Sequence, residues 1–232
     1  MAIAFVNSAV GDAGAVASST IASAAFSVTT GNTIIVGVSS YNAGAFRTVT
    51  GIADTAGNTY TKCGAGYNAD AGSDIEIWVA TNITGNASNI VTATFSNTTA
   101  YRHIAACQYS GLATSSVYDA GSTGKLDASD TTSHSSNTAV TSVADEVIVC
   151  WFVTWNTLQT YSASSPYTIR ANGTGGNLVC MVDQIVSSTG TYGVTVGTSS
   201  ANQQVSIART FKMQQASPAT TYASSLRVVW IN

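Results

Sequence analysis

The chain has 232 residues, with eight lysines and arginines against eleven acidic residues, and only 8% of its residues are charged. Soluble domains are usually about 25% charged, so the 30 serines and 33 threonines of this sequence must provide much of its polar surface. Because 45% of the residues are hydrophobic and the net charge is small, the composition excludes intrinsic disorder. The length suits one large all-β domain or two small ones, and either can bury a core.

The basic residues and the apolar segments exclude two further classes of protein. Lysines and arginines are scattered singly from Arg47 to Arg227, so no cluster is present to neutralise nucleic-acid phosphates. No apolar run approaches the ~20 residues that a membrane-spanning helix needs. The first seven residues have neither a basic leader nor a long apolar stretch, so we expect no signal peptide here and synthesis in a cytosol, or else a chain whose leader has been removed.

Periodicity along the chain is that of strands. Ile75, Ile77 and Val79 alternate with Glu76 and Trp78, which places the apolar set on one face of a pleated sheet. Similar short runs are separated by Gly, Asn, Ser and Asp, a pattern typical of an antiparallel β-sandwich. The sequence therefore predicts an all-β fold, with strands near 22–28, 33–40, 46–52, 59–63, 74–81, 89–96, 101–110, 145–154, 166–170, 177–187, 191–197, 203–213 and 222–231.

Turns and linkers divide these strands. Gly57 and Asn58 supply the tolerance of positive φ that a tight connection needs. The stretch from Gly121 to Thr141 is almost entirely Ser, Thr, Gly, Asp and Ala, which predicts a long exposed loop. A polar hinge with Pro218 follows residue 213, so we expect a sandwich domain over 1–213 and a separate hinge and strand over 214–232.

The four cysteines, which form no C-x-x-C pair, do not predict a zinc site. Cys107, Cys150 and Cys180 lie in apolar segments, where a free cysteine behaves as a small hydrophobic residue. We therefore expect buried free thiols at these three positions, and no catalytic thiol at Cys63 either. One disulfide is the alternative for a protein that works outside a cell.

Catalytic groups are scarce. Of the two histidines, His103 is expected on a sheet surface and His134 in the Ser/Thr-rich loop. No metalloprotease, serine-hydrolase or phosphate-loop motif occurs in the chain. The sequence therefore predicts no enzyme, no catalytic residue, no metal and no cofactor.

The carboxylates have structural interpretations as well. The two glutamates, Glu76 and Glu146, stand beside Asp74 and Asp145 at strand starts, where charges commonly mark the point at which a strand meets solvent. Asp183 lies in the middle of a strand, so we expect it to pair with an arginine, for which the candidates are Arg102, Arg170 and Arg209.

A calcium site is a weaker alternative for the acidic turns. Its oxygen ligands would come from Asp70, Ser73 and Asp74, or from Asp127 and Asp130. Neither cluster matches an EF-hand loop.

Aromatic residues suggest a binding surface. Tyr41 and Phe46 flank a glycine-containing loop, and several rings gather after the apolar run 147–153. Since that run is expected in the core, Trp155 and Tyr161 are the better candidates for exposed rings that stack on a sugar.

Five short strings occur along the chain in a particular order: D-T-A-G-N-T-Y at 54–60, E-I-W-V-A at 76–80, Y-S-G-L at 109–112, Asp119, and A-D-E-V-I-V at 144–149. This order resembles a jelly-roll-like β-sandwich family found among tailed-phage virion proteins of the decoration or fibre type and in some bacterial surface proteins. The resemblance covers roughly residues 3–213. It implies a jelly-roll-like fold and a place in a virion, and it defines no catalytic or ligand residue.

Two functions follow as expectations. The first is a non-enzymatic virion structural protein, such as a capsid decoration, cement or head-fibre subunit, which acts by packing against further copies and other virion proteins. The alternative is a carbohydrate-binding adhesin or tail-fibre module that recognises a host surface glycan. A hydrolase is barely supported. No nucleic acid or membrane partner is expected for any of them.

The last strand is the expected contact between subunits. Residues 222–231 have strand composition and an apolar end, and such a segment must add to a sheet, its own or a neighbour's. The interaction residues would be Tyr222, Leu226, Val228, Trp230 and Ile231.

Overall fold

The computed structural model describes residues 2–42, 44–69, 72–154, 159–173 and 178–215. Antiparallel β-strands joined by turns build this part of the chain, and it contains no α-helix. Several sheets pack against one another, which confirms the predicted all-β sandwich class. The jelly-roll connectivity stays a prediction.

The first half of the chain forms one large sheet and one small one. Its strands are β1 (Ala4–Ala13), β2 (Ser18–Ala22), β3 (Phe26–Val28), β4 (Thr33–Tyr41), β5 (Val49–Asp54), β6 (Thr61–Lys62), β7 (Tyr67–Ala69), β8 (Ser73–Ala80), β9 (Asn86–Asn89) and β10 (Val91–Ser110). The main order is β1-β10-β4-β8-β6. In addition β2 and β5 pair with β10, β7 pairs with β8, and β3 and β9 form the small sheet.

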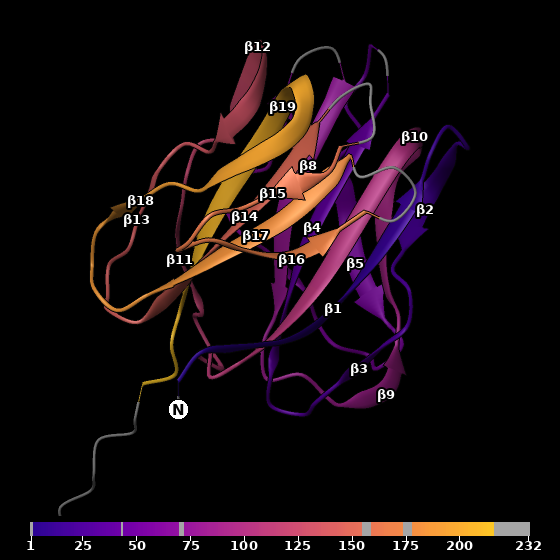
Figure 1. Cartoon of the computed structure of the whole chain (residues 1–232). Coiled ribbons are helices and arrows are strands. Elements are labelled where there is room, and N and C mark those ends of the chain that lie inside the picture. Colours follow the sequence, from indigo (N-terminus) through magenta and orange to yellow (C-terminus); the bar gives the residue numbers. More distant parts are fainter. Residues whose placement is uncertain (1, 43, 70–71, 155–158, 174–177, 216–232) are drawn as a thin grey trace, which may run out of the picture.

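The second half also forms one large sheet and one small one. Its strands are β11 (Tyr118–Gly121), β12 (Lys125–Ser135), β13 (Ala139–Val140), β14 (Glu146–Thr154), β15 (Tyr161–Ser162), β16 (Thr168–Asn172), β17 (Val179–Val186), β18 (Thr191–Tyr192) and β19 (Thr195–Lys212). The main order is β11-β19-β14-β17-β16, while β12 and β15 also pair with β19 and β13 pairs with β18. Figure 1 shows the indigo-to-magenta half and the orange-to-yellow half packed side by side.

The two halves repeat one set of strand pairings. In the first, β4 lies between β10 and β8, and in the second, β14 lies between β19 and β17. The registers agree as well: Ile34 pairs with Gln108 and Ala80 where Ile148 pairs with Thr210 and Gln184. In each half the longest strand uses its N-terminal part to pair with two additional strands. The described part of the chain therefore contains an internal structural repeat, in which the second half has the same strand pairing as the first.

Side chains support this register. Phe5 and Tyr109 are paired in the first half, with ring centroids 5.7 Å apart. Tyr118 and Phe211 are paired at the equivalent position of the second half, at 6.3 Å. Both aromatic pairs belong to the core between the two halves.

Three apolar cores result from the alternation of side chains along the central strands. Ile35 of β4 and Val149 of β14 face the opposite half and belong to the largest core. Their neighbours Ile34 and Ile148 point the other way, into a separate core within each half. Both central strands are buried on both faces, which explains their nearly continuous apolar sequence.

Gly37 and Trp151 occupy equivalent positions and meet in the shared core. Gly37 pairs with Ala105 in β10, and Trp151 pairs with Ile207 in β19. A Cβ atom on Gly37 would stand 2.6 Å from Cδ2 of the Trp151 ring. The indole of one half therefore fills the space that the missing side chain of the other half leaves.

The predicted turn at Gly57 is present. Gly57 has a φ of 77° and donates its backbone N–H to the carbonyl of Asp54 at 3.2 Å. The Asp54 carboxylate also accepts bonds from the Asn58 backbone at 2.9 Å and from the Tyr60 hydroxyl at 2.8 Å. The prediction of positive φ is confirmed at Gly57.

Several strands escaped the sequence analysis, and β1 and β12 are the longest of them. β1 was not predicted, and the stretch from Gly121 to Thr141 was wrongly predicted as a loop. It contains β12, which pairs with β19 over much of its length. The reason is that all of β12 except His134 is exposed or half-buried, so serine and threonine replace the usual apolar alternation.

Candidate functional site

Asp183 is buried between the two halves and pairs with Arg170. The Arg170 Nε and the Asp183 Oδ1 lie 2.8 Å apart, and the Tyr109 hydroxyl donates to Asp183 Oδ2 at 3.0 Å. The guanidinium also stacks 4.7 Å from the centroid of the Phe5 ring. Burial raises the pKa of Asp183, and Arg170 opposes that effect. The predicted arginine partner is confirmed, and the pair joins β16 and β17 to β1 and β10.

Arg209 is a second buried cation in this interface. It donates to the carbonyls of Ser122 and Ala208, each at 2.8 Å, and to those of Cys63 and Ala65 in the first half. The Arg209 guanidinium thus donates hydrogen bonds to four backbone carbonyls. Its role is to hold the halves together.

Asp74 and Glu76 are buried, which contradicts the prediction that they mark where a strand meets solvent. Glu76 bonds the Lys62 ammonium at 2.8 Å and the Trp78 indole N–H at 2.7 Å. Burial, together with the Glu76 charge, raises the pKa of Asp74 to about 8. β7 pairs with the start of β8 and β6 with its end, so the outer edge of β8 is covered and these polar partners replace water there.

Glu146 corrects the same prediction in the second half. It is buried at the start of β14 and accepts the Val143 backbone N–H at 3.2 Å. Burial raises its pKa. Its sequence neighbour Asp145 instead sits in the turn, with a φ of 59°.

His103 is buried, although it was expected on a sheet surface. Its Nδ1 lies 3.1 Å from Oδ1 of Asp12, and the contact with His103 lowers the pKa of that carboxyl. The pair links β10 to the end of β1, where the two strands are adjacent.

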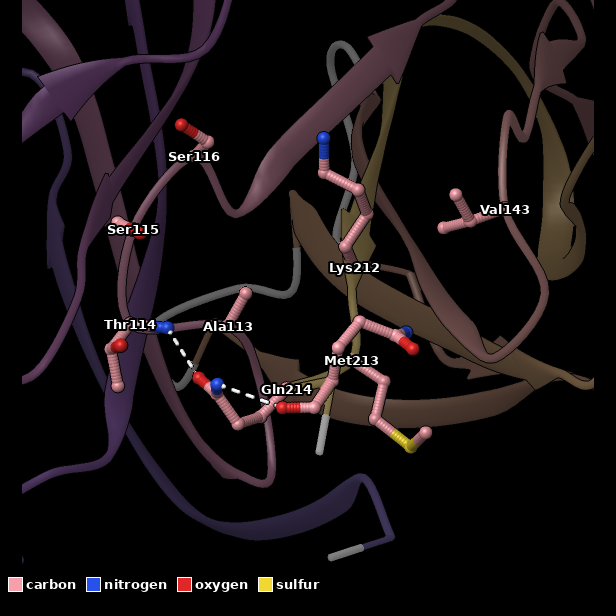
Figure 2. Close-up of a pocket in the computed structure, with 9 residues that line it drawn as sticks. Ala113, Thr114, Ser115, Ser116, Val143, Lys212, Met213 and Gln214 are labelled. Atoms are coloured by element: carbon pink, nitrogen blue, oxygen red, sulfur yellow. Dashed lines mark hydrogen bonds between the residues drawn. The ribbon is translucent and has the colours of Figure 1, made fainter. Parts of the chain in front are cut away.

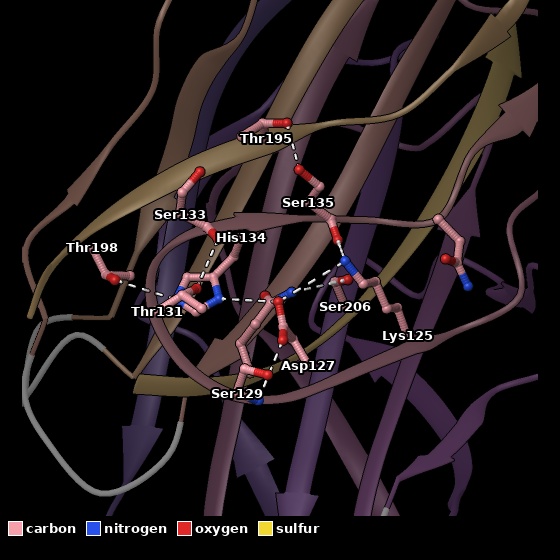
Figure 3. A network of polar contacts seen from close by, with 12 residues as sticks. Lys125, Asp127, Ser129, Thr131, Ser133, His134, Ser135, Thr195, Thr198 and Ser206 are labelled. Carbon is pink, nitrogen blue, oxygen red and sulfur yellow. Dashed lines mark hydrogen bonds and ion pairs between the residues drawn. The ribbon is translucent and has the colours of Figure 1, made fainter. Parts of the chain in front are cut away.

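His134 is buried as well, although it was expected in an exposed loop. Figure 3 shows its ring between Asp127 Oδ2, 3.9 Å from Nδ1, and the Thr198 hydroxyl, 3.3 Å from Nε2. Lys125 completes the network by donating to the Ser135 carbonyl at 2.9 Å. Burial lowers the pKa of His134, so the ring is neutral near pH 7 and packs as part of the fold.

The four thiols are free and buried, which confirms the prediction for Cys107, Cys150 and Cys180 and adds Cys63. Burial raises the pKa of Cys63 to about 12 and raises the pKa values of the other three as well. The thiolate form is therefore suppressed, which leaves these cysteines as packing residues.

The two aromatic residues predicted to stack on a sugar, Trp155 and Tyr161, have different outcomes. Tyr161 is only 6% exposed, and its hydroxyl lies 2.9 Å from the Thr154 hydroxyl, so the prediction of an exposed ring is wrong. It pairs with β19 and fills the inner core of the second half. Trp155 lies outside the described residues, as do the five interaction residues Tyr222, Leu226, Val228, Trp230 and Ile231.

The end of β19 borders a depression of about 270 Å³ (Figure 2). Its walls are Ala113, Thr114, Ser115, Ser116, Val143, Lys212, Met213, Gln214 and Gln215. The chain is fixed here by both halves: Gln214 donates its N–H to the Gly111 carbonyl at 2.8 Å, and Met213 donates to Asp145 at 3.0 Å. The Gln214 side chain accepts the Thr114 N–H at 2.9 Å. We call this region the tail root.

A second surface feature is an exposed aromatic pair at the bend of β10. Tyr41 is 39% exposed and Tyr101 43% exposed, and their ring centroids lie 6.2 Å apart. Phe46, in the loop after β4, is 43% exposed. We call these three residues the aromatic patch. Sequence analysis had marked Tyr41 and Phe46 but had placed Tyr101 in a regular strand.

The C-terminal part of β10, residues 101–110, separates the aromatic patch from the tail root. Tyr101 stands at the bend of β10 and Gly111 directly follows its end, a separation of about 30 Å in extended chain. Figure 1 shows this strand running the length of its half. The described fold therefore has two poles, one where the chain leaves and one that presents rings to solvent.

No family model, curated protein or solved structure matches the chain. Within the described ranges, no helix has the length and apolarity to cross a membrane. The same residues contain no group of three or more His, Cys, Asp or Glu placed to hold a metal ion. Asp70, a ligand of the calcium alternative, lies outside them.

Proposed function

We propose that this protein is a non-enzymatic virion structural subunit, of the capsid decoration, cement or head-fibre type. It acts by oligomerising and by packing against other virion proteins. The proposal combines the resemblance of the five sequence strings with the two-pole arrangement of the fold.

The tail root is the observation that carries the proposal. Up to Gln214 the chain is held by backbone hydrogen bonds from both halves. The next residues lead into the apolar segment 222–231, whose strand composition requires a sheet or groove to cover it. A depression stands directly beside the exit point, and Val140, near its Val143 wall, is 58% exposed.

In this proposal the segment 222–231 of one subunit pairs with a neighbouring subunit. Main-chain hydrogen bonds would supply affinity, and Trp230 and Val228 would occupy apolar grooves of the partner. Charged side chains contribute little, since only 8% of the residues are charged.

Truncation after Gln215 tests the proposal, because it removes the segment and leaves the tail root intact. We expect the full chain to sediment as an oligomer and the 1–215 chain to sediment as a folded monomer with a similar melting temperature. A full-length variant with Val228→Ser and Trp230→Ser serves as the matched control for chain length and should also be monomeric.

Equal stoichiometry of the full chain and both variants in analytical ultracentrifugation would count against the segment as the contact. The virion assignment is tested separately. Mass spectrometry of purified parent particles should find the wild-type chain. When the 1–215 chain replaces the wild type during assembly, the purified particles should contain no 1–215 chain.

A further inference from the structure

Tyr101 has a backbone conformation that bulky residues avoid. Its φ is 45°, in the left-handed region that is strained for a residue with a large side chain. The surrounding contacts impose this conformation: the Tyr101 N–H donates to the Gly14 carbonyl at 2.6 Å. The strain turns the ring outward beside Tyr41 instead of continuing the alternation of β10.

Arg102 holds the same bend of β10 in place from the buried side. Its buried guanidinium donates to the carbonyls of Val16 at 2.8 Å and Thr20 at 3.0 Å, and also to that of Thr99. On the other side, the Thr99 hydroxyl donates to the Tyr41 carbonyl at 3.1 Å. The backbones that carry both rings are therefore rigidly placed, although the rings themselves are exposed.

The loop that carries Phe46 is tied to the same bend. Arg47 donates from Nε to the Thr98 carbonyl at 3.2 Å, and the Ser40 hydroxyl donates to the Arg47 carbonyl at 3.2 Å. Arg47 and Asn42 directly follow Phe46 and Tyr41 in the chain, and Thr98 is three residues before Tyr101, so a guanidinium, an amide and a hydroxyl are available close to the aromatic patch along the chain.

The size of the aromatic patch decides what kind of partner fits it. With roughly 200 Å² on each aromatic side chain, the exposed fractions of the three rings amount to roughly 250 Å². A stable protein interface needs about 800 Å² on each partner, most of it around an apolar centre. One or two sugar rings need no more than the patch offers, because a pyranose presents an apolar face and a polar edge.

We propose that the aromatic patch binds a glycan. Tyr41 and Tyr101 stack on the C–H faces of neighbouring sugar units, while Arg47, Asn42 and Thr98 hydrogen-bond their hydroxyl groups. This site goes beyond the structural function proposed above and does not depend on it, since the patch lies at the opposite pole from the tail root.

The test is glycan binding by the full chain. The probe is an immobilised array of oligosaccharides of glucose, galactose, mannose, N-acetylglucosamine and uronic acids, followed by calorimetric titration with the strongest binder. Tyr41→Ala removes one ring, and Tyr101→Asn removes the other while keeping a residue that tolerates positive φ. Ile185→Ala, which trims a 45% exposed residue of β17, is the control.

We expect wild type and the Ile185→Ala variant to bind with Kd values within twofold of each other. Each patch variant should bind more than tenfold more weakly at an unchanged melting temperature. If Tyr101→Asn fails to fold, the Tyr41→Ala and Phe46→Ala pair gives the same comparison. The 1–215 chain should retain glycan binding, which separates this site from the tail.

Three results would overturn the proposal. The first is a wild-type protein that binds no saccharide on the array. The second is binding that Tyr41→Ala and Tyr101→Asn leave unchanged. The third is a change of oligomeric state in these variants, which would assign the aromatic patch to a contact between proteins.

Discussion

The edge of the main sheet carries its charged groups at different positions in the two halves of the molecule, and in the second half these groups are Arg170 and Asp183. In the first half it carries Lys62, Asp74 and Glu76. At the positions of the same register the second half carries Ile169, Leu178 and Cys180. Both versions support the same strand pairing, so the fold requires buried groups that satisfy one another, whether by ion pairing or by packing.

At the centre of the interface between the halves, equivalent positions must carry different side chains. There the two halves must differ, because Gly37 and Trp151 share one space. Two indoles would collide and two glycines would leave a cavity. Repetition of the backbone therefore does not allow repetition of the side chains at every position.

Removal of the Trp151 ring should have the largest effect on stability. Trp151→Ala deletes a fully buried indole from the largest core and should lower the free energy of unfolding by about 3–5 kcal/mol. Denaturant titration measures the loss.

A double-mutant cycle sharpens this comparison. Gly37→Ala should destabilise the wild type by about 1–3 kcal/mol, because its methyl group meets the indole. In the Trp151→Ala background the same substitution should be neutral or stabilising. Additive losses in the double variant would show that the two positions do not share space.

The charged edge should make the stability of the first half depend on pH. The pKa of Asp74 is about 8 in the folded chain and near 3.9 when unfolded, so within that window the folded state holds a proton that the unfolded state has lost. Stability therefore falls as pH rises, with Asp74 contributing a loss of about 2 kcal/mol between pH 6 and pH 7.5.

Asp74→Asn isolates this contribution, because the amide cannot ionise. Urea titrations at the two pH values should show a smaller loss of stability in the variant than in wild type. Parallel pH profiles of the two proteins would rule out Asp74 as the source.

The smallest effect is expected at the turn of Gly57 in the first half. Gly57→Val should cost about 1 kcal/mol or more, because β-branched residues resist a φ of 77°. Gly51→Ala is the control: Gly51 lies in β5 without positive φ, and a Cβ atom there meets nothing within 4 Å. A Gly57→Val variant that melts with the Gly51→Ala protein would contradict the strain argument.

Sequence patterns located what depends on neighbours along the chain. The predicted strands 33–40, 74–81 and 145–154 match β4, β8 and β14 closely, because buried central strands read as apolar runs. The turn at Gly57 followed from its dipeptide. For the candidate sites, the sequence marked Tyr41 and Phe46 but could not pair them with Tyr101, which is distant in the chain.

What only the tertiary structure decided is which groups meet. The sequence indicated an all-β chain with little charge, with free thiols and with an arginine partner for Asp183. It could not show that Arg170 is that partner, that both histidines are buried or that Tyr161 is covered, since each depends on strands from distant segments. The internal repeat was hidden for the same physical reason. Backbone hydrogen bonds set the register of a sheet, whereas its side chains need only fill the remaining volume, so two halves with different sequences can share one pattern of pairing.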